Sequence, residues 1–155
     1  MNAATEHARP EHCCWRRGEF EISTDPSRID LPAVHQFLAV SYWAKGIPLA
    51  ILRRALEHSL CFGIYEGARQ VGFARAITDC ATFAYVADVF VIEAYRGRGL
   101  AKWLMECIKG HPDLQRLRRW ALITRDAHGL YRQCGFTPLS NPQGWMEIHH
   151  PDVYR

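Results

Sequence analysis

The sequence predicts a single α/β domain built around one mixed β-sheet. Its 155 residues suit one domain with its own hydrophobic core. Hydrophobic residues make up 48% of the chain and charged residues 23%, which is the ordinary balance of a globular protein. Segments with strand and helix periodicity are mixed along the chain, without an internal repeat, a linker or a low-complexity stretch, so that one α/β layer architecture fits them.

The elements follow from local patterns. Residues 1–14 are polar at the start and are expected to form a flexible tail, so the folded domain is expected to span 15–155. Asp30 is a typical N-cap with Pro32 in the first turn, and apolar residues then recur at helical spacing. Helices are expected at 31–40, 49–60, 100–109 and 126–133. Strands are expected at 15–22, 59–65, 70–78, 84–92 and 117–124, with a short strand after Phe136 and a final strand at 145–149.

The composition of the chain excludes some classes of function. A formal net charge of +3 is too mild for a nucleic-acid partner, although it suits a polyanionic cofactor. No segment is apolar and long enough to span a membrane, and the polar start lacks the core of a signal peptide, so we expect a cytoplasmic protein. The six cysteines include no C-x-x-C pair and are expected to be reduced. His12, Cys13 and Cys14 have no second ligand cluster at zinc-like spacing, so no metal is expected.

The strongest local motif is the stretch YRGRGLA at residues 95–101, between an expected strand and an expected helix. Gly97 and Gly99 allow a tight turn and a close approach of the backbone to a ligand. Free N–H groups at the start of the next helix can hold phosphate oxygens, with Arg96, Arg98 and Lys102 adding positive charge. A plain strand-to-helix connection without a ligand is the alternative. The motif is neither a Walker loop nor a dinucleotide fingerprint, because the required lysine and third glycine are missing.

Two ordered motifs resemble those of the GNAT N-acetyltransferases. Residues 96–101 match the family signature Q/R-x-x-G-x-G/A, and residues 88–95 resemble the strand that leads into it. Residues 127–136 (AHGLYRQCGF) resemble the later A-x-x-L-Y-x-x-x-G-F stretch. The resemblance covers about residues 60–148. It implies a GNAT fold, with a mostly antiparallel mixed sheet that is splayed at its centre and flanked by helices.

The resemblance also implies a division of labour at the site. The backbone of Arg96, Gly97, Arg98, Gly99, Leu100, Ala101 and Lys102 is expected to bind the pyrophosphate of acetyl-CoA. The backbone of Val91, near a bulge in its strand, is expected to hydrogen-bond the pantetheine arm or the acetyl carbonyl. The cofactor is expected to enter between the Val91 strand and the Leu122 strand. Tyr131 matches the general acid that protonates the leaving thiolate.

Asp88 is the first candidate for the base that accepts a proton from the amine, because it lies on the strand beside the acetyl position. Similar polyamine acetyltransferases carry two adjacent acids in this stretch, whereas Ala87 precedes Asp88 here. Alternation along a strand also places Asp88 on the opposite face from Val91, which favours a structural role as the alternative.

The acceptor pocket is expected from Tyr42, Trp43, Arg75 and Asp79. An aromatic wall with an acidic group suits a cationic amine, whereas Arg75 favours a substrate that carries a carboxylate. Ordinary core packing is the alternative for the aromatic residues. These residues therefore leave the acceptor class open.

Together these features predict an acetyl-CoA-dependent N-acetyltransferase acting on a primary amine, with a small molecule as the acceptor. A CoA-binding sensor without catalysis and a peptide or protein N-acetyltransferase are the alternatives. The oligomeric state is open, with a homodimer as one outcome that involves the segment His149-His150-Pro151.

Overall fold

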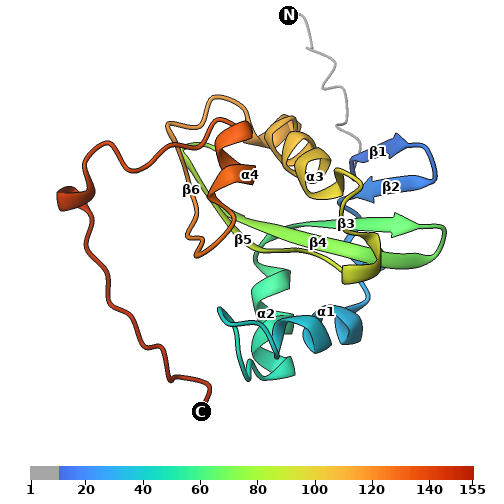
Figure 1. Cartoon of the computed structure of the whole chain (residues 1–155), viewed down its shortest axis with the longest axis horizontal. Coiled ribbons are helices and arrows are strands. Elements are labelled where there is room, and N and C mark those ends of the chain that lie inside the picture. Colours follow the sequence, from blue (N-terminus) through green and yellow to red (C-terminus); the bar gives the residue numbers. More distant parts are fainter. Residues whose placement is uncertain (1–10) are drawn as a thin grey trace, which may run out of the picture.

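A computed structural model describes residues 11–155 as one α/β unit, with a six-stranded sheet between two helical layers (Figure 1). The strands are β1 (Cys14–Arg17), β2 (Phe20–Ser23), β3 (Leu60–Glu66), β4 (Arg69–Thr78), β5 (Phe83–Val91) and β6 (Arg119–Ala121). The helices are α1 (Leu31–Leu38), α2 (Leu49–Glu57), α3 (Leu100–Lys109) and α4 (His128–Gln133). The predicted fold class is confirmed.

The strands lie in the order of the sequence, from β1 to β6. All neighbouring pairs are antiparallel except β5 and β6, which run parallel. Because a parallel pair needs a crossover connection, α3 lies between these two strands in the chain. α3 and α4 cover one face of the sheet, and α1 and α2 cover the other (Figure 1).

The N-terminal part differs from the prediction. One strand was expected over 15–22, but β1 and β2 form a hairpin that turns at Gly18, whose φ is +57°. A glycine adopts this left-handed backbone without steric cost, so the chain reverses there. Of the expected tail, residues 1–10 lie outside the described residues. The rest is part of the domain, because Cys14 begins β1 and the Cys13 carbonyl accepts a hydrogen bond from the Thr24 N–H.

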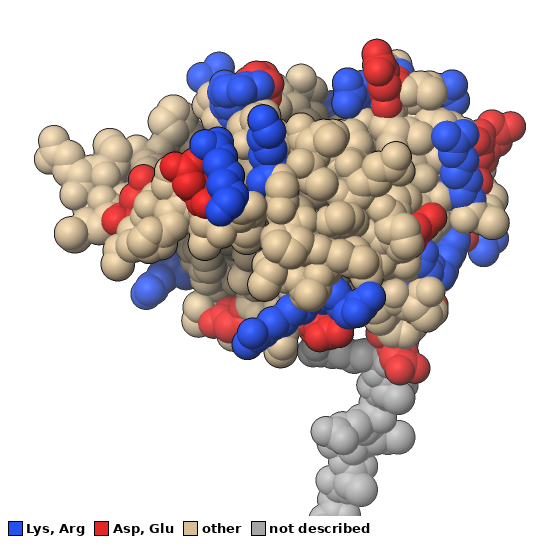
Figure 2. All heavy atoms as spheres, turned by 90° about the horizontal axis from the view of Figure 1, so that it is seen from below, with Lys and Arg blue, Asp and Glu red and all other residues tan. Residues whose placement is uncertain are grey.

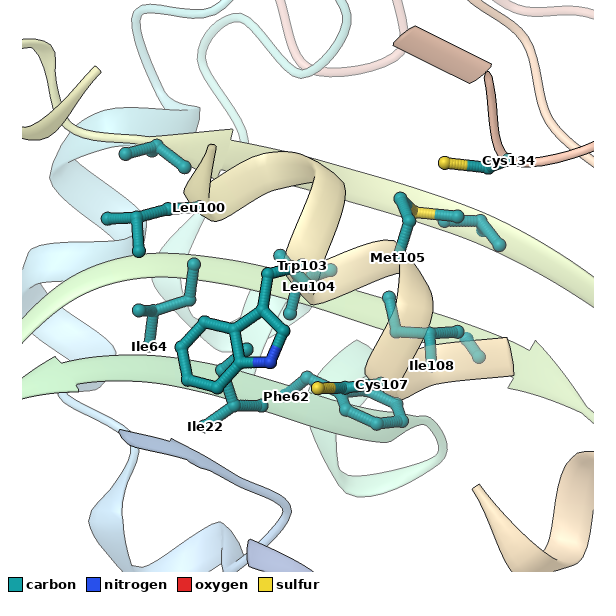
Figure 3. Close-up of a cluster of buried hydrophobic side chains, with 14 of the residues drawn as sticks. Ile22, Phe62, Ile64, Leu100, Trp103, Leu104, Met105, Cys107, Ile108 and Cys134 are labelled. Atoms are coloured by element: carbon teal, nitrogen blue, oxygen red, sulfur yellow. The ribbon is translucent and has the colours of Figure 1, made fainter. Parts of the chain in front are cut away.

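The larger core lies between the sheet and α3 (Figure 3). The apolar stripe of α3 includes Leu100, Leu104 and Ile108, all of which are buried. They pack on side chains that alternate along the strands, such as Ile22 and Ile64. The helical period of α3 and the two-residue period of the strands thus bury the two apolar faces against each other.

A tight packing constraint lies inside β3. The Tyr65 hydroxyl is buried and has no hydrogen-bond partner among the described residues. A β-carbon at Gly63 would overlap the Tyr65 hydroxyl and ring, so only glycine fits at that position as the ring now lies. Burial raises the pKa of Tyr65 to about 12.

The second core lies between the sheet and α1 with α2. Phe37 of α1 stacks on Phe90 of β5, with the ring centroids 3.8 Å apart. Asp30 caps α1 as predicted, because its carboxylate accepts a hydrogen bond from the Ala33 N–H. Seen from the α1–α2 side, charged side chains of both signs lie mainly around the edge of an uncharged centre (Figure 2).

The C-terminal predictions are wrong in part. β6 spans only Arg119–Ala121, not 117–124, and α4 begins after Ala127 without a side-chain cap from Asp126. Residues 137–155, which we name the C-terminal arm, contain the short η4 turn (Pro142–Gly144) and neither of the two expected strands. The arm curves outward from the domain after α4 (Figure 1), and its end returns close to Gly46 in the loop between α1 and α2. An alternating apolar pattern forms a strand only where a neighbouring strand accepts its hydrogen bonds, and no strand among residues 11–155 pairs with the arm.

Among residues 11–155, no helix has the length and apolar character needed to cross a membrane.

Replacing Asp30 by Ala should lower the free energy of unfolding by about 1 kcal/mol, because the α1 N-cap is lost. Urea unfolding followed by circular dichroism measures this. Asp30→Ser keeps an oxygen acceptor and should remain close to the unmodified protein. Equal losses in both variants would show that the capping hydrogen bond does not stabilise α1.

Candidate active site

The sheet opens between β5 and β6. The two strands pair only between Phe83–Tyr85 and Arg119–Ala121. Beyond these residues β5 continues to Val91, whereas the chain after Ala121 leaves the sheet as an irregular segment that leads to α4. The central splay that the resemblance implied is therefore present.

A β-bulge in β5 decides which way its side chains point. Between the pairs Arg75–Ala87 and Phe73–Phe90, two residues of β5, Asp88 and Val89, lie opposite the single residue Ala74. Asp88 adopts a left-handed backbone with φ of +56°, which aspartate tolerates better than most residues. The bulge expected near Val91 is thus present, and Asp88 faces the α1–α2 side while Val91 packs in the α3 core.

Both carboxylate oxygens of Asp88 are occupied. The Arg75 guanidinium donates a hydrogen bond from Nε to Oδ2 at 2.5 Å, and the Trp43 indole donates to Oδ1 at 3.0 Å. Only 7% of the Asp88 side chain and 16% of the Arg75 side chain are exposed. Arg75 also donates to the Ser59 hydroxyl at 3.0 Å. Arg75 is therefore held inside the protein by hydrogen bonds from its Nε and Nη1.

Tyr42 and Trp43 lie together in the loop between α1 and α2, with their rings edge to face and the centroids 5.0 Å apart. Both side chains are partly exposed, as an acceptor wall would be. Tyr42 also contacts Arg125. The Arg125 guanidinium carbon lies 3.8 Å from the Tyr42 ring centroid, and the Arg125 backbone N–H donates to the Tyr42 hydroxyl at 3.2 Å. Arg125 was not predicted, since no local pattern links it to Tyr42.

Asp79 is not brought to this cluster. It lies in the turn between β4 and β5, where its carboxylate accepts hydrogen bonds from the N–H groups of Ala81, Thr82 and Phe83. The hydrogen bond from the Thr82 hydroxyl is the main reason that the pKa of Asp79 lies well below its usual value. These contacts give Asp79 a role in shaping the turn.

Tyr131 lines a cavity of about 450 Å³. The cavity is bounded by the segment after β6, by α4 and by the start of the arm, and its lining includes Leu122, Thr124, Phe136 and Leu139. Tyr131 is only 9% exposed, and burial raises the pKa of its hydroxyl to about 12. The phenol therefore carries its proton throughout the neutral range and can donate it.

The glycine-containing loop has the backbone needed for a close contact with an anion. Gly97 and Gly99 have φ of +76° and +73°, and the position of a β-carbon on either glycine is open space. Gly99 is the N-cap of α3 and offers no side chain to the free N–H groups of the first turn. Leu100 anchors the helix in the core, and Ala101 packs against it.

The positively charged side chains of this loop differ in whether other groups of the protein hold them in place. Arg96 is held, because its Nε donates to the Val91 carbonyl at 3.0 Å. The Arg98 guanidinium carbon lies 5.1 Å from the centre of the Tyr95 ring, and Lys102 is exposed on the first turn of α3. Arg98 and Lys102 thus surround the uncapped helix start with positive charge. This arrangement fits a pyrophosphate group.

No group of three or more His, Cys, Asp or Glu side chains in residues 11–155 is arranged to hold a metal ion.

Comparison with known proteins decides the family. Residues 57–138, which include the bulged strand, the glycine loop and Tyr131, match the family described as "Acetyltransferase (GNAT) domain". The chain belongs to the GNAT acetyltransferases. It is therefore an acyltransferase, and enzymes of this family use acetyl-CoA.

Relatives agree with this assignment. A protein of Gibberella zeae that is provisionally named an acetyltransferase is 33% identical over 141 residues, which cover 76% of this chain and 78% of the relative. A crystal structure from Xanthomonas campestris pv. campestris, provisionally named a GNAT acetyltransferase, is 52% identical with a TM-score of 0.86. It covers 88% of this chain and 97% of that one.

A more distant structure shares the fold and was solved with the donor. It is a provisionally named acetyltransferase from Clostridium acetobutylicum with acetyl-CoA bound, and it is 13% identical with a TM-score of 0.57. The alignment covers 77% of this GNAT chain and 87% of the other.

Replacing Arg75 by Met should lower the free energy of unfolding by about 3 kcal/mol, because the buried Asp88 carboxylate would lose its charge partner. Guanidinium chloride unfolding measures this loss. Arg53→Met changes an exposed arginine on α2 and serves as the matched control, with little change expected. If Arg75→Met were no more costly than the control, the ion pair would not hold the bulge.

Proposed function

We propose that this GNAT enzyme transfers the acetyl group of acetyl-CoA to a primary amine of a small molecule by direct attack, with Tyr131 as the general acid. The observation that carries the proposal is the position of Tyr131, a buried and protonated phenol in the wall of a cavity formed by β6, the segment that follows it, α4 and the start of the arm.

The binding site for acetyl-CoA, the acetyl donor, is formed by the glycine turn before α3 and by the first residues of α3. The backbone N–H groups from Gly97 to Ala101 would hold the pyrophosphate, helped by the positive end of the helix dipole and by the charges of Arg98 and Lys102. The backbone of Val91 would orient the pantetheine arm along the unpaired part of β5. Acetyl-CoA supplies an activated thioester, and the chain supplies binding, orientation and a proton.

The proton comes from Tyr131. Burial raises its pKa to about 12, so the hydroxyl holds a proton at neutral pH, although the same shift makes it a weaker acid. The ring is fixed by its edge-to-face contact with Phe136, whose centroid lies 5.9 Å away. Such fixed geometry favours general-acid catalysis, because the donor does not have to be ordered during the reaction.

Asp88 is a weaker candidate for the base. Each carboxylate oxygen already accepts a hydrogen bond, from the Trp43 indole or the Arg75 guanidinium, and only 7% of the side chain is exposed to an amine. The contacts of Asp88 support its structural alternative, in which the carboxylate fixes the bulge and the Trp43 ring. A water molecule that carries the proton away from the amine is compatible with the partly exposed rim formed by Tyr42 and Trp43.

A small molecule fits the volume of the Tyr131 cavity, since small-molecule sites commonly occupy about 300–1,000 Å³, and the Tyr42–Trp43 rim is a separate surface that does not line it. Peptide and protein acceptors remain the competing class. A CoA sensor would need the glycine loop but not a protonated phenol in the cavity wall. The six free cysteines of the described chain support a reducing compartment, and we place the enzyme in the cytoplasm on this ground.

Acetyl-CoA turnover, followed as free thiol release, should depend on one class among amines, polyamines, amino acids and short peptides. Calorimetry should show CoA binding to the same preparation. CoA binding without release by any acceptor would favour the sensor. Failure to bind CoA would remove the basis of the proposal.

Tyr131→Phe should lower kcat by about 100-fold while CoA affinity is retained, because only the transferable proton is removed. Steady-state kinetics and calorimetry separate the two effects. Tyr65→Phe is the matched control: Tyr65 is also buried with a raised pKa, but it lies in β3 and does not line the cavity. An unchanged kcat in Tyr131→Phe would exclude the phenol as the acid.

A further inference from the structure

The Arg125 guanidinium lies on the aromatic rim formed by Tyr42 and Trp43. Its carbon is 3.8 Å from the centre of the Tyr42 ring, a distance at which a cation and an aromatic ring attract each other. The backbone N–H of Arg125 donates to the Tyr42 hydroxyl, which fixes the Arg125 backbone beside the same ring. Arg125 is therefore held against the loop between α1 and α2, although it belongs to the segment between β6 and α4.

This guanidinium keeps hydrogen-bond donors that a ligand can use. An arginine that stacks on an aromatic ring still presents N–H donors from the edge of its planar group. Within residues 11–155, the charge partner of Arg125 is Asp126, and the 3.7 Å between Nη2 and Oδ2 is too long for a hydrogen bond. Both side chains are 65% exposed, and an ion pair between exposed side chains contributes little. A ligand carboxylate can therefore compete with Asp126 for the guanidinium.

Arg125 lies close to the proposed acid. The preceding residue, Thr124, lines the Tyr131 cavity, so the chain passes from the cavity wall to the aromatic rim at these two residues. The pKa of Tyr131 is raised mainly by burial and next by the charge interaction with Tyr42, so the two phenols lie within electrostatic reach of each other. A ligand on Arg125 would therefore be next to the cavity that holds the acid.

The charges at the rim favour an anionic group over a polyamine. The Asp88 carboxylate, which would attract a cationic chain, is paired with Arg75, covered by the Trp43 indole and only 7% exposed. The Arg75 side chain is 16% exposed, whereas that of Arg125 is 65% exposed. Arg125 is thus the more accessible of the two guanidinium groups, and an accessible guanidinium on an aromatic rim suits a carboxylate.

We propose that Arg125 binds a carboxylate of the acceptor, so that the small-molecule substrate is an amine that also carries a carboxylate, as amino acids do. Two N–H groups of the guanidinium donate to the two carboxylate oxygens, while the Tyr42 ring holds the guanidinium in place. The amine of the same molecule then lies toward the unpaired end of β5, where the acetyl group is expected. The inference rests on the proposed acetyl transfer to a small amine and names the class of acceptor.

The experiment measures free thiol release from acetyl-CoA with matched pairs of acceptors. Each pair is an amino acid and the amine that remains when its carboxylate is removed: alanine with ethylamine, phenylalanine with phenethylamine, and lysine with cadaverine. In the pair that the enzyme uses best, kcat/KM should be at least about tenfold higher for the amino acid, because only the amino acid makes the charge-assisted contact. Arg125→Gln should raise KM for that amino acid by about 10- to 100-fold, with kcat and the turnover of its partner amine nearly unchanged.

Arg53→Gln removes an exposed arginine on α2 and serves as the control, with no change expected for either member of a pair. If Arg125 only ordered the loop at Tyr42, Arg125→Gln would slow both members equally, and this result would overturn the inference. Equal use of the two members by the unmodified enzyme would also overturn it, while acetyl transfer to a small amine would stand. Absence of thiol release with every acceptor would overturn the proposed function and this inference together.

Discussion

The bulge at Asp88 is the constraint on which the arrangement of the site depends. The extra residue in β5, Asp88, adopts a left-handed backbone and is held by the Arg75 guanidinium. It shifts the alternation of the following side chains by one residue, so that each lies on the opposite face of the sheet. As a result Phe90 faces the α1–α2 core, while Val91 faces the α3 core beside the glycine loop. A regular strand would place these two side chains on exchanged faces. The Phe37–Phe90 stack would then lose one of its rings.

The bulge also separates the α3 side of the site from its α1–α2 side, and the two sides offer different chemical groups. On the α3 side, the unpaired end of β5 and the start of α3 offer backbone groups and positive charge, which suit an anionic donor. On the α1–α2 side, Trp43 and Tyr42 form an aromatic rim that Arg125 links to the segment leading to α4. The two halves meet at the splay, where β5 continues beyond its pairing with β6.

The predictions that the structure confirms rest on patterns within short stretches of the sequence. The N-cap at Asp30, the glycine loop and the core strands are short-range patterns, and they are confirmed with shifts of a few residues at their ends. The missed features depend on distant partners: the Arg75–Asp88 ion pair, the Tyr42–Arg125 contact and the absent C-terminal strands. A hydrophobic alternation shows that a segment can form a strand, but it does not supply the neighbour that completes one.

The contact between Gly63 and Tyr65 has a consequence for how this sequence can diverge. Because the tyrosine hydroxyl occupies the space of a β-carbon at position 63, the two positions are not free to change independently. Substitution at Gly63 is harmful while the ring of residue 65 is present, because its Cζ and Cε2 would lie 2.5 and 2.6 Å from the new β-carbon even without the hydroxyl. Loss of the ring from position 65 opens room for a side chain at position 63. The order of the two changes therefore matters. Replacement of the ring at position 65 is the permissive first step, and the pair is an epistatic one within a single strand.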